Sequence, residues 1–159
     1  SEVTYHLHPV GYVRHTDGGY QLHILEPYRP ALKQLDQFIY AMVFWWAHEH
    51  DNPKDRNVMQ AELPYAPGEV AGVFACRAEC RPNPIALTTS FIIDIDEEAG
   101  NVQLAWIDAH DGTPVLDLKT YVPISDRIRD VGVVPWFEGL PEWMEDAAVF
   151  FAESDFLGD

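Results

Sequence analysis

The chain has 159 residues and a formal net charge of −16, from 26 acidic and 10 basic side chains. Its length predicts one domain with a sizeable core, and a hydrophobic fraction of 47% excludes a disordered protein. No apolar run approaches the ~20 residues that cross a bilayer, and the N-terminus lacks the regions of a signal peptide. Both cysteines lie in one short motif rather than in a disulfide framework. We therefore expect a cytoplasmic protein with no membrane partner.

The negative charge argues against a polyanionic partner, because nucleic-acid binding requires a basic surface that releases counterions. An acidic surface also keeps a protein soluble. Combined with a low lysine count (Lys33, Lys54 and Lys119), it is typical of adaptation to high salt. The charge therefore limits the substrate without defining the reaction.

The first half of the chain predicts strands around one short helix. Residues 4–14 and 20–25 alternate between apolar and polar side chains, and the sequence Asp-Gly-Gly at 17–19 predicts a hairpin turn between them. Residues 30–38 have apolar side chains three to four apart after a proline, which predicts a short helix. The aromatic run at 39–48 predicts a buried strand.

The second half begins with a polar stretch at residues 50–69, whose three prolines predict a long loop. Further strands are predicted at residues 70–76, 85–96, 102–109 and 115–121. From Pro141 the spacing becomes helical again and predicts a C-terminal helix near residues 141–155. Many short strands with two short helices predict a mainly β chain with a closed or sandwiched antiparallel sheet. The glycine-rich dinucleotide and P-loop motifs are absent, so a nucleotide-like cofactor would need another architecture.

The stretch GVFACRAECRPNPIAL at residues 72–87 contains two of the chain's scarce cations, Arg77 and Arg81. Pro82 and Pro84 fix an extended backbone after them, so the pair is expected on a rigid loop and not on a helix. The guanidinium group matches the geometry of a carboxylate or a phosphate. The two arginines are therefore either an anion clamp or partners of the chain's own acids.

A second cluster, Asp108-Ala109-His110-Asp111, precedes Gly112 and belongs to a tight turn at a strand end. Acidic side chains there either cap the turn or accept hydrogen bonds from ribose hydroxyls or an ammonium group. A third cluster, at residues 48–51, reads His-Glu-His-Asp and could hold a metal, as could the two cysteines. No set of four has a recognised zinc spacing, and we expect no metal.

Several of these motifs together resemble the TsaA-like family, also called the TrmO or class VIII methyltransferase family. The resemblance rests on residues 72–84, on the sequence DAHDGTPVLDLK at 108–119, and on the Val-Pro pair at 122–123. The segment LEPYRPALKQLDQFIYAMVFWWAH at 25–48 resembles the family's helix-then-strand segment. The resemblance covers about residues 8–125.

The resemblance implies a closed or partly open antiparallel β-barrel that binds S-adenosylmethionine and commonly forms a homodimer, with the cofactor near the subunit interface. It implies one TsaA-like domain over residues 1–159, with the barrel at about 3–135 and a helical tail at about 136–159. The best-known members methylate the exocyclic nitrogen of threonylcarbamoyladenosine in tRNA.

The resemblance also assigns roles to individual residues. The positions that match the family's cofactor-binding residues are His48, Glu49, Arg77, Arg81, Thr89, Asp108, Ala109, His110 and Asp111. A general base is needed only for a protonated acceptor, and Glu49 and Asp111 are the candidates.

The chain departs from the family at a short loop between Arg14 and Tyr20, and at three positions. Glu49 replaces a typical glutamine, Cys80 a histidine or aromatic residue, and Ala86 a glycine. Three functions stay open. The chain is a methyltransferase acting on tRNA, a methyltransferase acting on a small-molecule nucleophile, or a non-catalytic S-adenosylmethionine-binding or regulatory protein.

Overall fold

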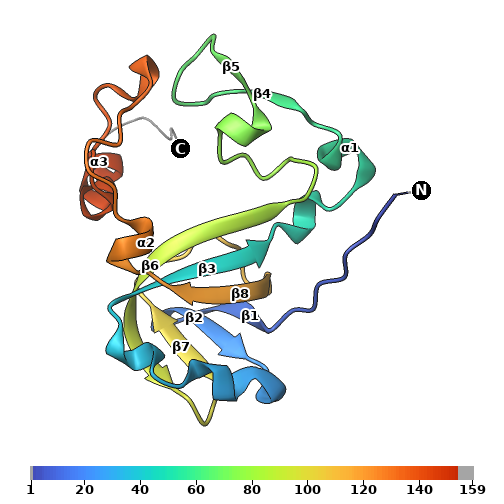
Figure 1. Ribbon diagram of the computed structural model, residues 1–159, viewed down its shortest axis with the longest axis vertical. Coiled ribbons are helices and arrows are strands. Elements are labelled where there is room, and N and C mark those ends of the chain that lie inside the picture. The colour runs from blue at the N-terminus through green and yellow to red at the C-terminus, as the bar shows by residue number, and fades with distance from the viewer. Residues whose placement is uncertain (1, 154–159) are drawn as a thin grey trace.

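In the computed structural model, which describes residues 2–153, six strands form a closed antiparallel barrel (Figure 1). The strands are β1 (Gly11–Thr16), β2 (Gly19–Ile24), β3 (Tyr40–Trp46), β6 (Ile85–Asp96), β7 (Asn101–Leu104) and β8 (Pro114–Thr120). Their order around the barrel is β1-β2-β7-β6-β3-β8, and β8 closes on β1. The prediction of a mainly β chain with a closed antiparallel sheet is confirmed.

The barrel interior is filled by the apolar residues that alternate along its strands. The fully buried side chains include Val13, Leu22, Val43, Val102, Leu104 and Val115. Burying one such side chain contributes roughly 1.5–3 kcal/mol, so the interior holds the barrel closed. Strand β3, predicted as buried throughout, alternates between buried and half-buried residues because its outer face is partly open.

A two-stranded hairpin stands away from the barrel (Figure 1). It pairs β4 (Gln60–Glu62) with β5 (Val70–Gly72) and follows the one-turn helix α1 (Pro53–Arg56). The predicted loop at 50–69 therefore contains a helix and a strand. The strand predicted at 70–76 ends at Gly72, and Val73–Ala75 forms a 3-10 turn, η4.

The short helix predicted at 30–38 is present in part, as 3-10 and not α-helical structure. The segment forms two 3-10 turns, η1 (Glu26–Leu32) and η2 (Leu35–Gln37). Between them Gln34 adopts a left-handed conformation with φ 73°, which an α-helix cannot contain. Pro30 inside η1 lacks the backbone N–H that a continuing helix would need.

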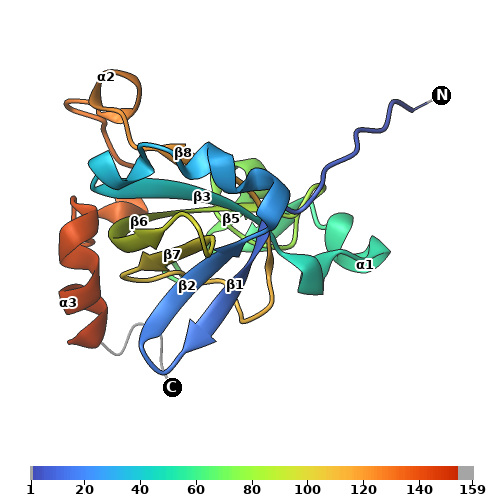
Figure 2. The same cartoon turned by 90° about the horizontal axis from the view of Figure 1, so that it is seen from below.

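Two predicted strands are shorter in the structure. The first, expected from residue 4, begins at Gly11, although Val10 still bonds to Val115 and Leu25. Residues 2–9 leave the barrel as an extended segment (Figures 1 and 2). The strand expected at 102–109 ends at Leu104 and continues as a loop. The pairing of Thr16 with Gly19 confirms the predicted hairpin turn.

After β8, the described residues 121–153 form only short helical turns. They are α2 (Pro123–Asp126), η5 (Pro135–Phe137), η6 (Met144–Asp146) and α3 (Ala147–Ala152). The C-terminal helix predicted near 141–155 thus begins later than expected, and its last two positions lie outside the described residues. This segment lies on the opposite side of the barrel from the N-terminus (Figures 1 and 2). Among residues 2–153, no helix is long and apolar enough to cross a membrane.

Candidate functional site

Three loops meet at one end of the barrel because of the way β3 pairs. This strand runs antiparallel to both β6 and β8, and Trp46 pairs with Ile85 while Trp45 pairs with Val115. The end of β3 therefore lies beside the beginnings of β6 and β8. The 3-10 turn η3 (His48–His50), the loop before β6 and the loop before β8 are brought together there.

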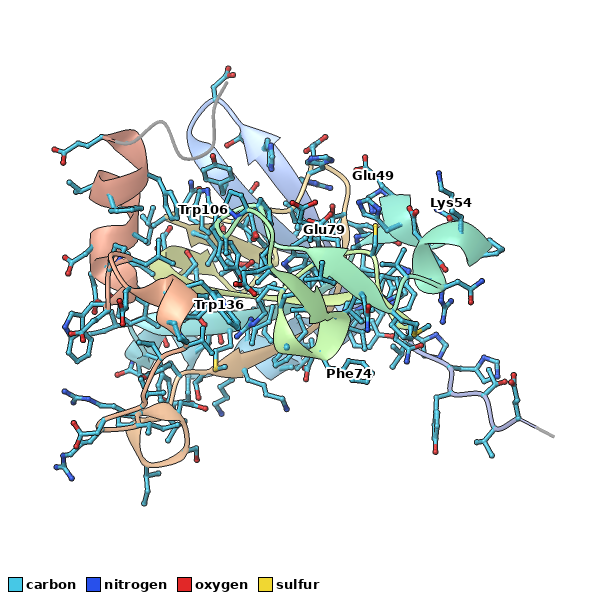
Figure 3. All side chains as sticks on the ribbon, turned by 90° about the horizontal axis from the view of Figure 1, so that it is seen from above. Glu49, Lys54, Phe74, Glu79, Trp106 and Trp136 are labelled. Atoms are coloured by element: carbon cyan, nitrogen blue, oxygen red, sulfur yellow. The ribbon has the colours of Figure 1, made fainter. Side chains whose placement is uncertain are left out.

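These loops border a shallow acidic pocket with a cavity volume of about 10 Å³. Its lining residues are Trp45, Ala47, His48, Glu49, His50, Glu79, Asp108, His110 and Thr113. Four of the predicted cofactor-binding residues are in this set. Three carboxylates line the pocket, and Figure 3 labels two of them, Glu49 beside α1 and Glu79 on the loop before β6.

Glu49 and His110 form an ion pair across this pocket, with 2.8 Å between Oε2 and Nδ1. The hydrogen bond from His110 lowers the pKa of the Glu49 carboxyl group. The same bond, followed by the charge of Glu49, raises the pKa of His110. The pair therefore favours an ionised glutamate and a protonated histidine.

Asp108 is oriented by a chain of two hydrogen bonds that begins in the barrel interior. The indole Nε1 of the buried Trp45 donates to Oγ1 of Thr88 at 3.0 Å. The Thr88 hydroxyl in turn donates to a carboxylate oxygen of Asp108. Because the buried hydroxyl uses its proton on Asp108, the carboxylate is held in one direction at the pocket.

Asp111 and Ala109 contact β1 instead of lining the pocket. The backbone N–H of His15 donates to Oδ1 of Asp111 at 2.8 Å, and the His15 Nε2 lies 2.8 Å from the carbonyl oxygen of Ala109. Both bonds tie the turn before β8 to the end of β1. Of the two roles predicted for Asp111, the structure shows the one that fixes the turn.

The two arginines predicted as an anion clamp have different surroundings in the structure. Both arginines lie on a loop with no helix or strand, as predicted. Nη1 of Arg81 donates to the carbonyl oxygens of Cys76 at 3.3 Å and Ala78 at 2.9 Å, so it stabilises its own loop. Arg77 is exposed, and within residues 2–153 neither arginine has an ion-pair partner. Neither lines the pocket, which this loop reaches through Glu79.

Thr89 points away from the pocket. Alternate residues of β6 face opposite sides of the sheet, and the buried Thr88 and Ser90 face inward. Thr89 therefore lies on the outer face, opposite Met42 of β3.

Three residues at this end of the barrel were missed by sequence reasoning: His15, Glu79 and Thr88. Thr88 could have been found from strand alternation, since the predicted strand at 85–96 places it on the inward face. Glu79 stands between the two arginines of the motif. For His15 the sequence carries no signal, because its partners lie far along the chain. His50 belongs to the predicted cluster at residues 48–51, but its contact with Glu79 could not be predicted from the sequence.

Comparison with known proteins decides the family. Residues 10–127 match the tRNA-methyltransferase O N-terminal domain. The chain belongs to this family. It is 30% identical over 118 residues to the S-adenosyl-L-methionine-binding protein of Archaeoglobus fulgidus, covering 74% of this chain and 80% of that protein.

Solved structures agree. A crystal structure of TrmO from Pseudomonas aeruginosa is 28% identical with a TM-score of 0.63, and a second TrmO structure is 30% identical with a TM-score of 0.62. Each match covers 82% of this chain, but only 62% and 64% of the crystallised chains. The chain thus spans less than two thirds of their length. The predicted family, barrel and cofactor, S-adenosylmethionine, are confirmed.

Proposed function

We propose that the acidic pocket binds the positively charged part of S-adenosylmethionine and that the chain transfers its methyl group to a nucleophile. The observation that carries this proposal is the convergence of Glu49, Glu79 and Asp108 at one end of the barrel. The cofactor has a sulfonium and an ammonium group against one carboxylate, and carboxylates attract such a net cation. The cofactor-binding roles of His48 and His110 rest on the same convergence.

When bound, the cofactor supplies an electrophilic methyl group on a sulfonium leaving group. The residues around it mainly have to hold the acceptor in line with that methyl group at near-attack distance. Asp108, fixed through Thr88, is suited to orienting a bound ligand.

Glu49 is better placed as a base than Asp111 because it lines the pocket. Its lowered pKa makes it a weak base.

The pocket of one chain, at about 10 Å³, is far too small for the whole cofactor, since small-molecule sites usually enclose about 300–1,000 Å³. We propose that a second copy completes it in a homodimer. No residue between 121 and 153 is buried, although this segment is rich in apolar side chains. Ile124 is 94% exposed, and Phe74 on η4, at the edge of the molecule in Figure 3, is 86% exposed. Apolar surface on this scale is typical of an interface.

For the acceptor, we favour a small-molecule nucleophile. The net charge of −16 and the acidic pocket both repel a phosphate backbone. Methylation of tRNA threonylcarbamoyladenosine is the second candidate, because the matching family is defined by a tRNA methyltransferase. We expect either reaction to take place in the cytoplasm, since Cys76 and Cys80 are both free thiols.

A transfer assay with a labelled methyl donor separates these functions. The protein is incubated with unfractionated tRNA in one arm and with a low-molecular-weight metabolite extract in the other. We expect label in the extract and none in the RNA. Label in the RNA would overturn the small-molecule assignment. Cofactor binding without transfer in either arm would favour the non-catalytic alternative. An Asp108→Asn variant controls for label that does not depend on the pocket.

A further inference from the structure

Next to the acidic pocket, three metal-ligating side chains from separate segments converge. His50 comes from η3, Asp55 from α1 and Cys80 from the loop before β6. The His50 Nδ1 lies 3.0 Å from Oδ2 of Asp55 and 3.3 Å from Sγ of Cys80. One ligand atom from each residue lies within 4.8 Å of the other two.

This spacing is close to that of a tetrahedral zinc site. Zinc binds nitrogen and oxygen at about 2.0–2.2 Å and sulfur at about 2.3 Å, so neighbouring ligand atoms are about 3.3–3.8 Å apart. The two measured separations are at or slightly below this range. Small side-chain rotations would open the set around an ion, and all three residues are half-buried, so the ion would be partly shielded from solvent.

The surroundings also match those of a metal site. A histidine that binds a metal through one ring nitrogen usually engages a carboxylate with the other. Here the His50 Nε2 lies 3.0 Å from Oε2 of Glu79, which leaves Nδ1 directed at Asp55 and Cys80. Asn52 fixes the aspartate, since its Nδ2 donates to Oδ2 of Asp55 at 3.1 Å and its Oδ1 accepts from the Asp55 N–H at 2.9 Å.

We propose that His50, Asp55 and Cys80 bind one divalent zinc-like cation, with water as the fourth ligand. Histidine nitrogen, thiolate and carboxylate together are the donor set of zinc, whereas magnesium and calcium prefer oxygen alone. Binding releases the thiol proton, and any proton on the His50 Nδ1, to solvent. The ion joins α1 to the loop before β6 and thereby holds Glu79 at the pocket.

The same cluster could be interpreted as a nucleophilic cysteine beside a histidine. Burial raises the pKa of the Cys80 thiol, and the charges of Asp55 and Glu79 raise it further. Such a thiol stays protonated and is a weak nucleophile. A cation bound among the three ligands compensates the negative charge of Asp55 and Glu79 and thereby favours the thiolate form of Cys80.

The proposal departs from the expectation of no metal. That expectation rested on the absence of a zinc spacing in the sequence, and positions 50, 55 and 80 match none. The pairing of β3 with β6 brings the segments that carry these positions together.

Metal binding to the intact protein tests the proposal, with Cys76 as an internal control. This second cysteine lies only four residues earlier, and its Sγ contacts the carbonyl oxygen of Val73 instead. The metal-stripped protein is titrated with Co²⁺ and Zn²⁺. We expect one ion per chain in the wild type and in Cys76→Ser, with a thiolate-to-cobalt charge-transfer band. Cys80→Ser and His50→Ala should lose the band and weaken binding at least tenfold.

Alkylation gives a readout that does not depend on spectroscopy or on methyl transfer. Zinc should protect Cys80 from a thiol reagent and leave the labelling of Cys76 unchanged, as mapped on peptides. Binding that is equally tight in Cys80→Ser, or equal labelling of the two cysteines with and without zinc, would overturn the proposal. If Cys76→Ser gives tetrahedral cobalt spectra, the loss expected in Cys80→Ser is not a general effect of mutating a thiol in this loop.

Discussion

Glu49 and His110 lie 2.8 Å apart across the end of the barrel and join the turn after β3 to the loop before β8. Each partner belongs to a segment that the sequence marked separately, one as a His-Glu-His cluster and the other as an acidic turn. The ion pair shows that the two clusters form a single site.

The first prediction concerns the titration of this pair. Replacing Glu49 with glutamine removes the acceptor that raises the pKa of His110, so that pKa should fall toward its ordinary value. A histidine NMR titration measures it directly. Glu97→Gln, an exposed substitution in the turn after β6, should leave the His110 titration unchanged. An unaltered pKa in Glu49→Gln would show that the pair does not form in solution.

The same pair gives stability a defined pH dependence. The raised pKa of His110 adds stability that is complete below its unfolded value of 6.5 and is lost as pH rises through the folded value. The lowered pKa of Glu49 adds stability above its unfolded value of 4.5 that is lost as pH falls through the folded value. The difference in unfolding free energy between wild type and Glu49→Gln should therefore be greatest between these two values. A difference that is flat from acid to alkaline pH would contradict this.

The second prediction compares the two neighbouring threonines of β6. Thr88→Val leaves the buried indole N–H of Trp45 without its acceptor and frees Asp108, so we expect a loss of about 1–3 kcal/mol in stability. Cofactor affinity should fall with it. Thr89→Val is isosteric, lies on the outer face and should change stability much less. Chemical denaturation and calorimetry of both variants measure these effects, and equal losses would contradict the hydrogen-bonded chain.

The third prediction concerns Arg56, which holds α1 against the loop before β6. Its guanidinium donates to the carbonyl oxygen of Pro82 at 2.8 Å and to Oδ1 of Asn83 at 3.0 Å. Arg56→Met should cost about 1–2 kcal/mol, since bonds from charged donors are strong but this side chain is partly exposed. Lys54→Met, an exposed position in the same helix turn, is the matched control and should cost little. Hydrogen exchange of the loop amides would show whether the loop opens selectively.

The fourth prediction separates the two motif arginines. Arg81→Ala removes donors to two carbonyl oxygens of its own loop and should lower the thermal midpoint. Arg77→Ala should leave stability unchanged, because this side chain is exposed and makes no hydrogen bond or ion pair within residues 2–153. If Arg77 contacts the cofactor carboxylate, its removal lowers the affinity for the cofactor without lowering stability. A variant Arg77→Ala with wild-type affinity would exclude that contact.

Much of the barrel could be predicted because its strands carry a local signal. The strand at 85–96 was found to the residue, and the turn after Thr16 followed from its Asp-Gly sequence. The failures arose where tertiary contacts override local pattern. Residues 30–38 have helical spacing, but a left-handed Gln34 divides them. Residues 2–9 alternate like a strand but make no backbone hydrogen bond to a strand within the described residues, whereas Val10 still bonds to Val115 and Leu25.

Several residues of the candidate site were predicted from the sequence, but the contacts between them were not. The sequence and the family resemblance identified His48, Glu49, Asp108 and His110, which the fold brings to one pocket. Neither could show that Arg81 bonds to its own loop or that Asp111 contacts the backbone of His15, 96 residues earlier. Such contacts depend on the register of the closed barrel, which local patterns do not encode.

Calorimetry with S-adenosylmethionine and S-adenosylhomocysteine, on the wild type and on Asp108→Asn, tests the central claim most directly. The acidic pocket should bind S-adenosylmethionine more tightly than its product, whose thioether sulfur carries no charge. Asp108→Asn should weaken the binding of S-adenosylmethionine by about tenfold or more, in line with the loss of a charged hydrogen-bond partner. The same substitution should weaken the binding of S-adenosylhomocysteine less. Absence of binding to the wild type, or equal affinity of both proteins for S-adenosylmethionine, would contradict the assignment of this pocket.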